Sequence, residues 1–207
     1  MKLTSRNIVL RLLVFGLAFT SFACLLGQFY GLWSMRLFSC VVFPPALLGL
    51  VWLARWGEPQ RAWIVIGAEA GIVAAVAYDL YRVPFVLNGA PLFTVFRKFG
   101  QMLLGGGGPR WLEEGLGWLY HFSNGAALGI MFLAMVAYAR PRTLFWGAVL
   151  WALFVETVLL LTPYSAFFGL KLNAWFIFLT ASAHLIFGIV LGLWSRYRFS
   201  PACSAIS

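Results

Sequence analysis

The sequence predicts an all-α integral membrane protein: a six-helix transmembrane bundle with an interfacial amphipathic helix between the third and fourth spans. Of its 207 residues 62% are hydrophobic and only 10% are charged, which is far from the balance of a soluble domain. The apolar residues fall into six runs, each close to the ~20 residues that cross a bilayer. Because these runs occupy nearly the whole chain, we expect residues 1–207 to form a single transmembrane domain.

The expected helices follow the apolar runs in order. The first run begins after Lys2, Arg6 and Arg11, as a signal peptide does, but it continues without a small-x-small cleavage site, so we expect a retained anchor. The second run carries Pro44 and Pro45 near its start and should begin late or bend there. The six predicted helices cover residues 9–33, 39–56, 63–82, 117–138, 143–162 and 173–195.

The connection over residues 83–116 has its own pattern. Polar side chains recur at helical spacing on one face and apolar side chains lie opposite, which predicts an amphipathic helix in the membrane interface. This helix would be either a structural brace or a lid over an outward-facing site. The polar face consists of Thr94, Arg97, Lys98 and Gln101, and the apolar face of Val95, Phe96, Phe99, Met102 and Leu103. Glycines at 105–108 then predict a flexible joint or linker.

The basic residues predict an orientation. The net charge of +9 comes from Lys and Arg placed singly or in pairs beside apolar runs, so we expect contact with the lipid bilayer and no nucleic-acid partner. With the N-terminus inside, nine basic residues lie inside and six outside, three of the six in the long connection. Basic loops stay in the cytoplasm. We therefore expect a multi-pass protein of the bacterial inner membrane, with both ends in the cytoplasm.

Ionisable residues inside the spans are the candidate site, because charges in hydrocarbon are costly and face the bundle interior. On this topology five polar residues share one depth near the outer ends of their helices. A sixth lies beneath them, closer to the midplane, while Glu69 lies in the inner half. The candidate ligand- or proton-binding residues are Asp79, Arg82, His121, Asn124 and Glu156, with His184 beneath them.

Each candidate has a structural interpretation and a functional one. Asp79 and Arg82, three residues apart on one helix, can form an ion pair, or Arg82 can hold an anion while Asp79 takes a proton or cation. His121 can make an interfacial hydrogen bond, or it can relay a proton or bind a ligand. Glu156 has no basic neighbour on its own helix. It is therefore either protonated or faces His121, Arg82 or a bound cation.

Small residues predict the packing. The third span is rich in glycine and alanine, from Gly67 to Ala77, which permits close backbone approach and a central position. The last span has a polar and small stripe that should face protein and not lipid. That stripe comprises Asn173, Thr180, His184, Gly188 and Ser195.

Metal and nucleophile signatures are absent from the sequence. No HExxH, ExxH or GxSxG motif occurs, so we expect no metal site, and the sequence leaves any cofactor unknown. The three cysteines have no CxxC spacing, which favours packing roles.

One resemblance involves two spans. Tyr120-His121 precedes Gly125, and His184 precedes Gly188 and Gly192. This placement of a histidine ahead of spaced glycines resembles small uncharacterised bacterial inner-membrane protein families. The resemblance implies a bacterial source and no activity.

Three functions fit these features. The first is a small transporter or membrane binding protein whose outer-half cluster handles a proton, a small cation or a small polar ligand. The second is an accessory or assembly subunit of a larger membrane complex, because the chain is 18% aromatic with short loops. The third is an intramembrane enzyme that acts on a lipid-like substrate, with His121 or Glu156 as general base.

Overall fold

The computed structural model describes residues 5–136 and 140–204, and within these ranges the chain is helical and contains no strand. The predicted all-α fold is confirmed. The helices are α1 (Ser5–Phe29), α2 (Met35–Val41), α3 (Phe43–Arg55), α4 (Gln60–Leu87), α5 (Thr94–Leu104), α6 (Arg110–Val136), α7 (Pro141–Leu161), α8 (Tyr164–Phe168) and α9 (Ala174–Ser204).

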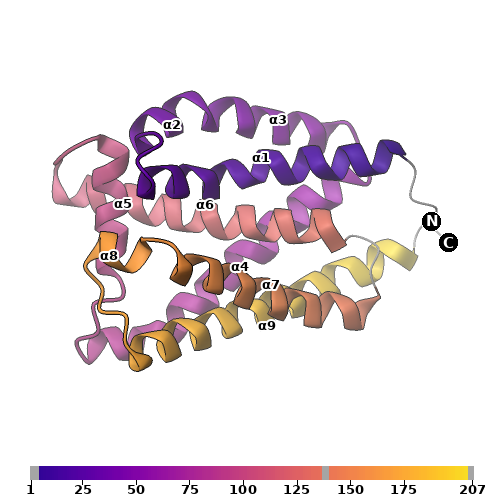
Figure 1. Ribbon diagram of the computed structural model, residues 1–207. Helices are drawn as coiled ribbons and strands as arrows, with labels where there is room; N and C mark the ends of the chain where they lie inside the picture. Colours follow the sequence, from indigo (N-terminus) through magenta and orange to yellow (C-terminus); the bar gives the residue numbers. More distant parts are fainter. Residues whose placement is uncertain (1–4, 137–139, 205–207) are drawn as a thin grey trace.

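Six segments of the described chain are long and apolar enough to cross a membrane, and α2 and α3 together form one of them. The protein is therefore a multi-pass membrane protein. The long helices run side by side, with α5 and α8 at one end of the bundle (Figure 1). The start of α1 and the end of α9 lie at the opposite end. We call these the α5 end and the terminal end.

The break between α2 and α3 lies where the sequence predicts it. The Val42 N–H still donates to the carbonyl of Phe38, and α3 then begins with Phe43 and Pro44 in its first turn. Proline fits there because the first N–H groups of a helix need no intrahelical acceptor. The span does not begin late, since α2 starts at Met35, but its helix is interrupted at Val42, directly before the proline pair.

Three predicted boundaries were wrong, and one of them is the end of the last span, because α9 continues past 195 to Ser204. α4 does not end at Arg82 but continues through Pro84 to Leu87, and α6 begins at Arg110, well before Gly117. The extra turns of α6 are covered by α5: a Cβ atom at Gly100 of α5 would overlap the Glu113 carbonyl oxygen, and one at Gly117 would overlap that of Phe96. Packing against α5 therefore accompanies the longer α6, whereas the added turn of α4 is itself apolar, Val83-Pro84-Phe85-Val86-Leu87.

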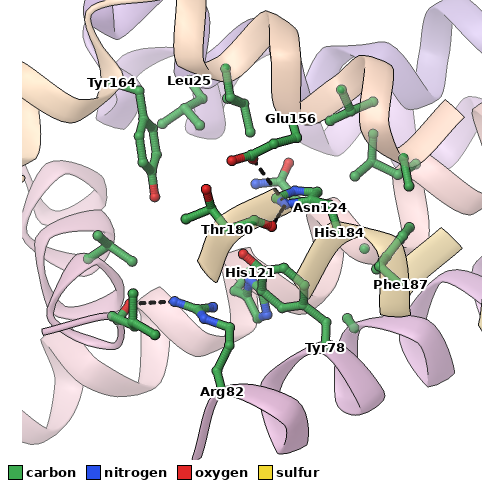
Figure 2. A pocket seen from close by; sticks show the side chains of 18 of the residues that line it. Leu25, Tyr78, Arg82, His121, Asn124, Glu156, Tyr164, Thr180, His184 and Phe187 are labelled. Atoms are coloured by element: carbon green, nitrogen blue, oxygen red, sulfur yellow. Dashed lines mark hydrogen bonds and ion pairs between the residues drawn. The ribbon is translucent and has the colours of Figure 1, made fainter. Parts of the chain in front are cut away.

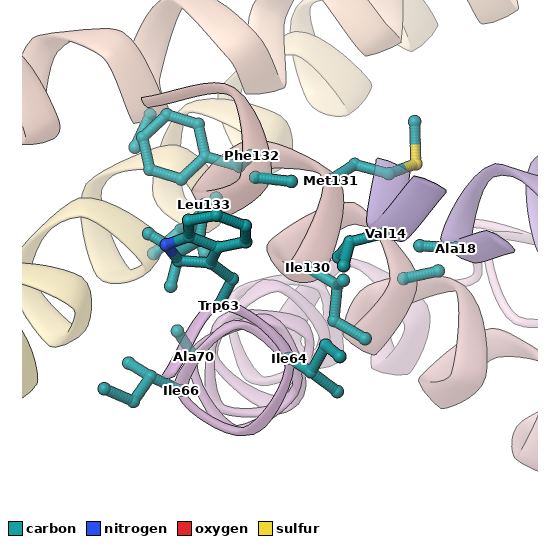
Figure 3. Close-up of a cluster of buried hydrophobic side chains, with 14 of the residues drawn as sticks. Val14, Ala18, Trp63, Ile64, Ile66, Ala70, Ile130, Met131, Phe132 and Leu133 are labelled. Carbon is teal, nitrogen blue, oxygen red and sulfur yellow. The ribbon is translucent and has the colours of Figure 1, made fainter. Parts of the chain in front are cut away.

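Small residues place α4 in the centre, as predicted. It packs against α6 and α9 and also touches α1 and α3. A Cβ atom at Gly71 would overlap the carbonyl oxygen of Gly125, and one at Gly129 would overlap that of Gly67. The α4 and α6 backbones are therefore in direct contact. Beyond this contact, Trp63 and Leu133 are fully buried in the core (Figure 3).

The polar stripe of α9 faces protein along most of its length. Ser195 is fully buried, and Gly188 packs against the α7 backbone at Ala148 and Val149. Asn173 is the exception, because it is exposed and its Oδ1 accepts a hydrogen bond from the N–H of Phe176, at the start of α9. The stripe thus begins at Thr180.

Candidate functional site

A cavity of about 120 Å³ lies near the α5 end, where α1, α4, α6, α7 and α9 surround it and α5 contributes to its wall. Most of the wall is apolar, and the polar side chains come from five different helices, α4, α6, α7, α8 and α9. Figure 2 shows these side chains around a common space. The polar or aromatic-polar lining residues are Tyr78, Arg82, His121, Asn124, Trp151, Glu156, Tyr164, Thr180 and His184.

The first group in the cavity wall is a buried triad. Asp79 Oδ2 lies 2.8 Å from His121 Nε2, and Asp79 Oδ1 lies 3.3 Å from Arg82 Nη1. Because a carboxylate can only accept, His121 Nε2 carries the hydrogen. Asp79 and Arg82 are only 6% and 5% exposed, and Asp79 is not part of the cavity lining. Asp79 therefore orients His121 from behind and neutralises Arg82.

Arg82 makes further contacts besides its ion pair with Asp79. Its Nη2 donates to the Leu92 carbonyl over 2.6 Å. Its guanidinium carbon lies 4.7 Å from the ring centroid of Tyr78 and 5.1 Å from that of Phe93. Aromatic faces stabilise a desolvated cation. Arg82 thus links α4 to the segment that leads into α5, and it is a fixed positive charge at the edge of the cavity.

The second group is the pair of Glu156 and His184. Glu156 Oε2 and the Thr180 carbonyl oxygen each lie 3.0 Å from His184 Nδ1. With Glu156 ionised, both neighbours are acceptors, so Nδ1 carries the hydrogen. The other carboxylate oxygen, Oε1, is buried and accepts no hydrogen bond from any described residue. Glu156 is 5% exposed and lines the cavity, so one of its oxygens is left for a ligand.

The two groups meet at Tyr78. Its ring centroid lies 6.1 Å from that of His121 and 5.0 Å from that of His184. Both imidazoles therefore flank one aromatic ring. Asn124 completes this side of the cavity and accepts a hydrogen bond from Ser21 Oγ of α1 over 2.6 Å.

The charges of the two groups do not cancel. Asp79 is paired with the permanent cation Arg82, whereas Glu156 is paired with His184, which is charged only when it is protonated. With both imidazoles neutral, the site carries one uncompensated negative charge in a low-dielectric surrounding, which is costly. One proton or one small cation restores neutrality. The arrangement can therefore hold a single extra positive charge.

The structure brings all six predicted residues together but pairs them differently. We expected Glu156 to be protonated or to face His121, Arg82 or a bound cation, and the structure places its Oε2 next to His184, a partner that was not among these. We expected His184 to lie beneath the cluster, and it lines the same cavity as His121. Glu69 lies elsewhere, with its Oε2 3.0 Å from Arg198 Nε.

Tyr78 and Tyr164 are site residues that the sequence analysis missed. Tyr78 lies four residues before Arg82 and therefore on the same face of α4, which was an available signal. Tyr164 lies in α8, between two spans, and no periodic pattern marks it. Burial raises the pKa of the Tyr164 phenol, so its hydroxyl is neutral at physiological pH.

Glu113 was also missed, and it anchors α5. It is 1% exposed. Its Oε2 accepts from Arg97 Nε over 2.6 Å and from Gln101 Nε2 over 3.1 Å, and its Oε1 accepts from the Gly108 N–H over 3.0 Å. The predicted amphipathic helix is present, but part of its polar face binds α6. Val95, Phe96 and Phe99 of its apolar face form part of the cavity wall.

Among the residues that the structure describes, no three His, Cys, Asp or Glu side chains gather as a metal site would require. Comparison of the chain with protein-family models, with curated proteins and with solved structures finds no match. The fold and the site therefore define only the class of protein. It is a multi-pass membrane protein with a buried, charged cavity whose wall includes α5.

Proposed function

We propose that this protein is a small membrane transporter or binding protein whose cavity takes up a proton, a small cation or a small polar ligand. The observation that carries the proposal is the Glu156 carboxylate, which lines the cavity with one buried oxygen that has no hydrogen-bond donor among the described residues. A buried acceptor left unsatisfied is costly and is usually occupied when the protein works.

The size of the cavity limits the ligand. Its volume of about 120 Å³ is slightly below that of the ~150 Å³ engineered cavities that hold benzene. A few water molecules or one molecule of a few heavy atoms fit. With both imidazoles neutral, the negative charge of Glu156 favours a cation or hydrogen-bond donor, which would sit between Glu156 Oε1 and the face of Tyr78.

The bacterial inner membrane is the proposed location, with both termini in the cytoplasm because the basic loops gather at that end. In this orientation the α5 end and its cavity face the periplasm. Small ligands would then enter from outside, beneath α5.

Proton and methylammonium uptake into proteoliposomes test the proposal, with an internal pH dye and an imposed membrane potential. Glu156→Gln keeps the shape of the side chain but removes the charge, and it should abolish uptake. Glu69→Gln is the matched control, because Glu69 also pairs with a basic side chain but lies away from the cavity. Uptake that survives Glu156→Gln, or that falls equally in both variants, would overturn the proposal.

If the wild-type protein transports neither protons nor methylammonium, ligand binding is measured instead. Methylammonium should then raise the melting temperature of the detergent-solubilised wild type, since a ligand that binds only the folded state stabilises it. Glu156→Gln should remove this increase. The absence of any increase in the wild type would exclude the cavity as a cation site.

A further inference from the structure

A second hollow lies between α1, α3, α4 and α6, as an open groove of about 1050 Å³. No residue of α7 or α9 lines it, although these helices complete the cavity. Its floor includes Ala18, Ile64 and Ile130, three of the buried side chains in Figure 3. The groove is thus an apolar channel on the outside of the bundle, separate from the charged cavity.

Two arginines border one end of this groove. Arg55 is the last residue of α3 and Arg61 is the second residue of α4, and both are exposed. Neither forms an ion pair with a described residue. Glu58 lies between them in the sequence but does not line the groove. The mouth of the groove therefore has two guanidinium groups without a counter-ion.

The length of the groove fits one leaflet of a bilayer. Its α3 wall runs from Phe43 to Arg55, a rise of about 18 Å, and one leaflet is about half of the ~30 Å hydrocarbon core. At the arginine end the rings of Trp52 and Trp56 lie 4.4 Å apart and are exposed. Exposed tryptophans mark the headgroup level. The arginines thus lie at headgroup depth and the apolar wall at acyl-chain depth.

A second copy of this chain is a poor occupant, because among its acidic side chains only Glu58 is without an ion pair within the described residues. The whole chain has six acidic residues, and the other five are already paired with basic side chains. A helix from another copy would fill the apolar wall but would leave the two arginines without an anion.

We propose that the groove binds one anionic phospholipid, with its phosphate between Arg55 and Arg61 and its acyl chains along α3 and α4. Basic pockets between transmembrane helices select anionic headgroups in this way. The proposal is independent of the transport function, because the groove and the cavity share no lining residue.

Native mass spectrometry tests the site. The purified protein is titrated with phosphatidylglycerol or with phosphatidylcholine of the same acyl chains. We expect a complex with one phosphatidylglycerol molecule and weaker binding of phosphatidylcholine. Replacing both arginines, Arg55→Gln with Arg61→Gln, should weaken phosphatidylglycerol binding about 30-fold, roughly fivefold for each charge. Arg140→Gln with Arg142→Gln is the matched control, a pair of exposed arginines at the start of α7, outside the groove.

A second variant fills the groove without changing its charge. Ala68 lines the groove, and Ala68→Leu should also weaken phosphatidylglycerol binding; Ala54→Leu, nearer the arginine end, replaces it if that variant does not fold. The proposal would be overturned by equal affinity for the two lipids. It would also be overturned if both double arginine variants lost phosphatidylglycerol binding to the same extent. A lipid-free dimer that Ala68→Leu dissociates would assign the groove to a second copy instead.

Discussion

The two halves of the α4–α6 helix pair are held together by different kinds of contact. Toward the terminal end, Gly67 and Gly71 meet the backbone of Gly125 and Gly129 without any intervening side chain. Toward the α5 end, Asp79 of α4 pairs with His121 of α6 and with Arg82 of its own helix. Backbone contact has a single allowed distance, whereas long polar side chains tolerate several. The glycine half therefore sets the spacing at which the charged half can form its short hydrogen bonds.

The largest expected effect comes from disrupting the glycine contact between α4 and α6. Gly71→Leu places a side chain where the Gly125 carbonyl lies, and because backbone cannot move aside, α4 and α6 must separate. We expect a loss of more than ~3 kcal/mol in stability, seen as little folded protein in detergent. Gly16→Leu is the control, since a Cβ atom there meets nothing within 4 Å. Equal yields of the two variants would contradict the role given to the α4–α6 contact.

The next effect comes from the charged half. Asp79→Asn leaves the buried Arg82 without its counter-charge, which should cost about 3 kcal/mol in thermal or chemical unfolding. The partly exposed pair of Glu69 and Arg198 is the comparison, and Glu69→Gln should cost less than ~1 kcal/mol. Combining Asp79→Asn with Arg82→Gln should cost less than the sum of the single losses. Strict additivity would show that the two side chains are not coupled.

A smaller and more local effect is expected at α5. Glu113→Gln weakens three hydrogen bonds that tie α5 and its following loop to α6. Amide hydrogens of α5 should then exchange roughly tenfold faster while those of α4 stay unchanged. Glu114→Gln is the control, because Glu114 pairs only with Arg110 on its own helix. Similar exchange in the two variants would mean that Glu113 does not hold α5 in place.

Hydropathy was sufficient to predict the spans, and the proline pair to predict the break between α2 and α3, because both depend on local composition. The ends of α4 and α6 were not predictable in this way. Arg82 and Glu113 look like boundary residues in a linear sequence. Their charges are buried because Asp79, Leu92 and Arg97 satisfy them, and such partners become visible only in three dimensions.

The side-chain pairings within the site were likewise not predictable from local sequence. Depth along each helix was enough to gather the candidate residues, since charged residues in a membrane turn inward. The partner of Glu156 depended on which faces of α7 and α9 meet. That choice is made by Gly188 and Gly192 of α9, which pack against the α7 backbone near Ala148, and glycine positions alone do not specify a rotation.

The smallest expected effect tests the cavity wall contributed by α8. Tyr164 points its hydroxyl toward the cavity (Figure 2), and Tyr164→Phe should weaken methylammonium binding about fivefold, the worth of one neutral hydrogen bond. Burial raises the pKa of this phenol above its usual ~10, so it stays protonated and the difference between wild type and variant should be constant from pH 6 to pH 9. Tyr197→Phe, at an exposed tyrosine outside the cavity lining, should change nothing. A wild-type advantage that grows with pH would reveal a phenolate attracting the cation, and would require the hydroxyl to be open to water.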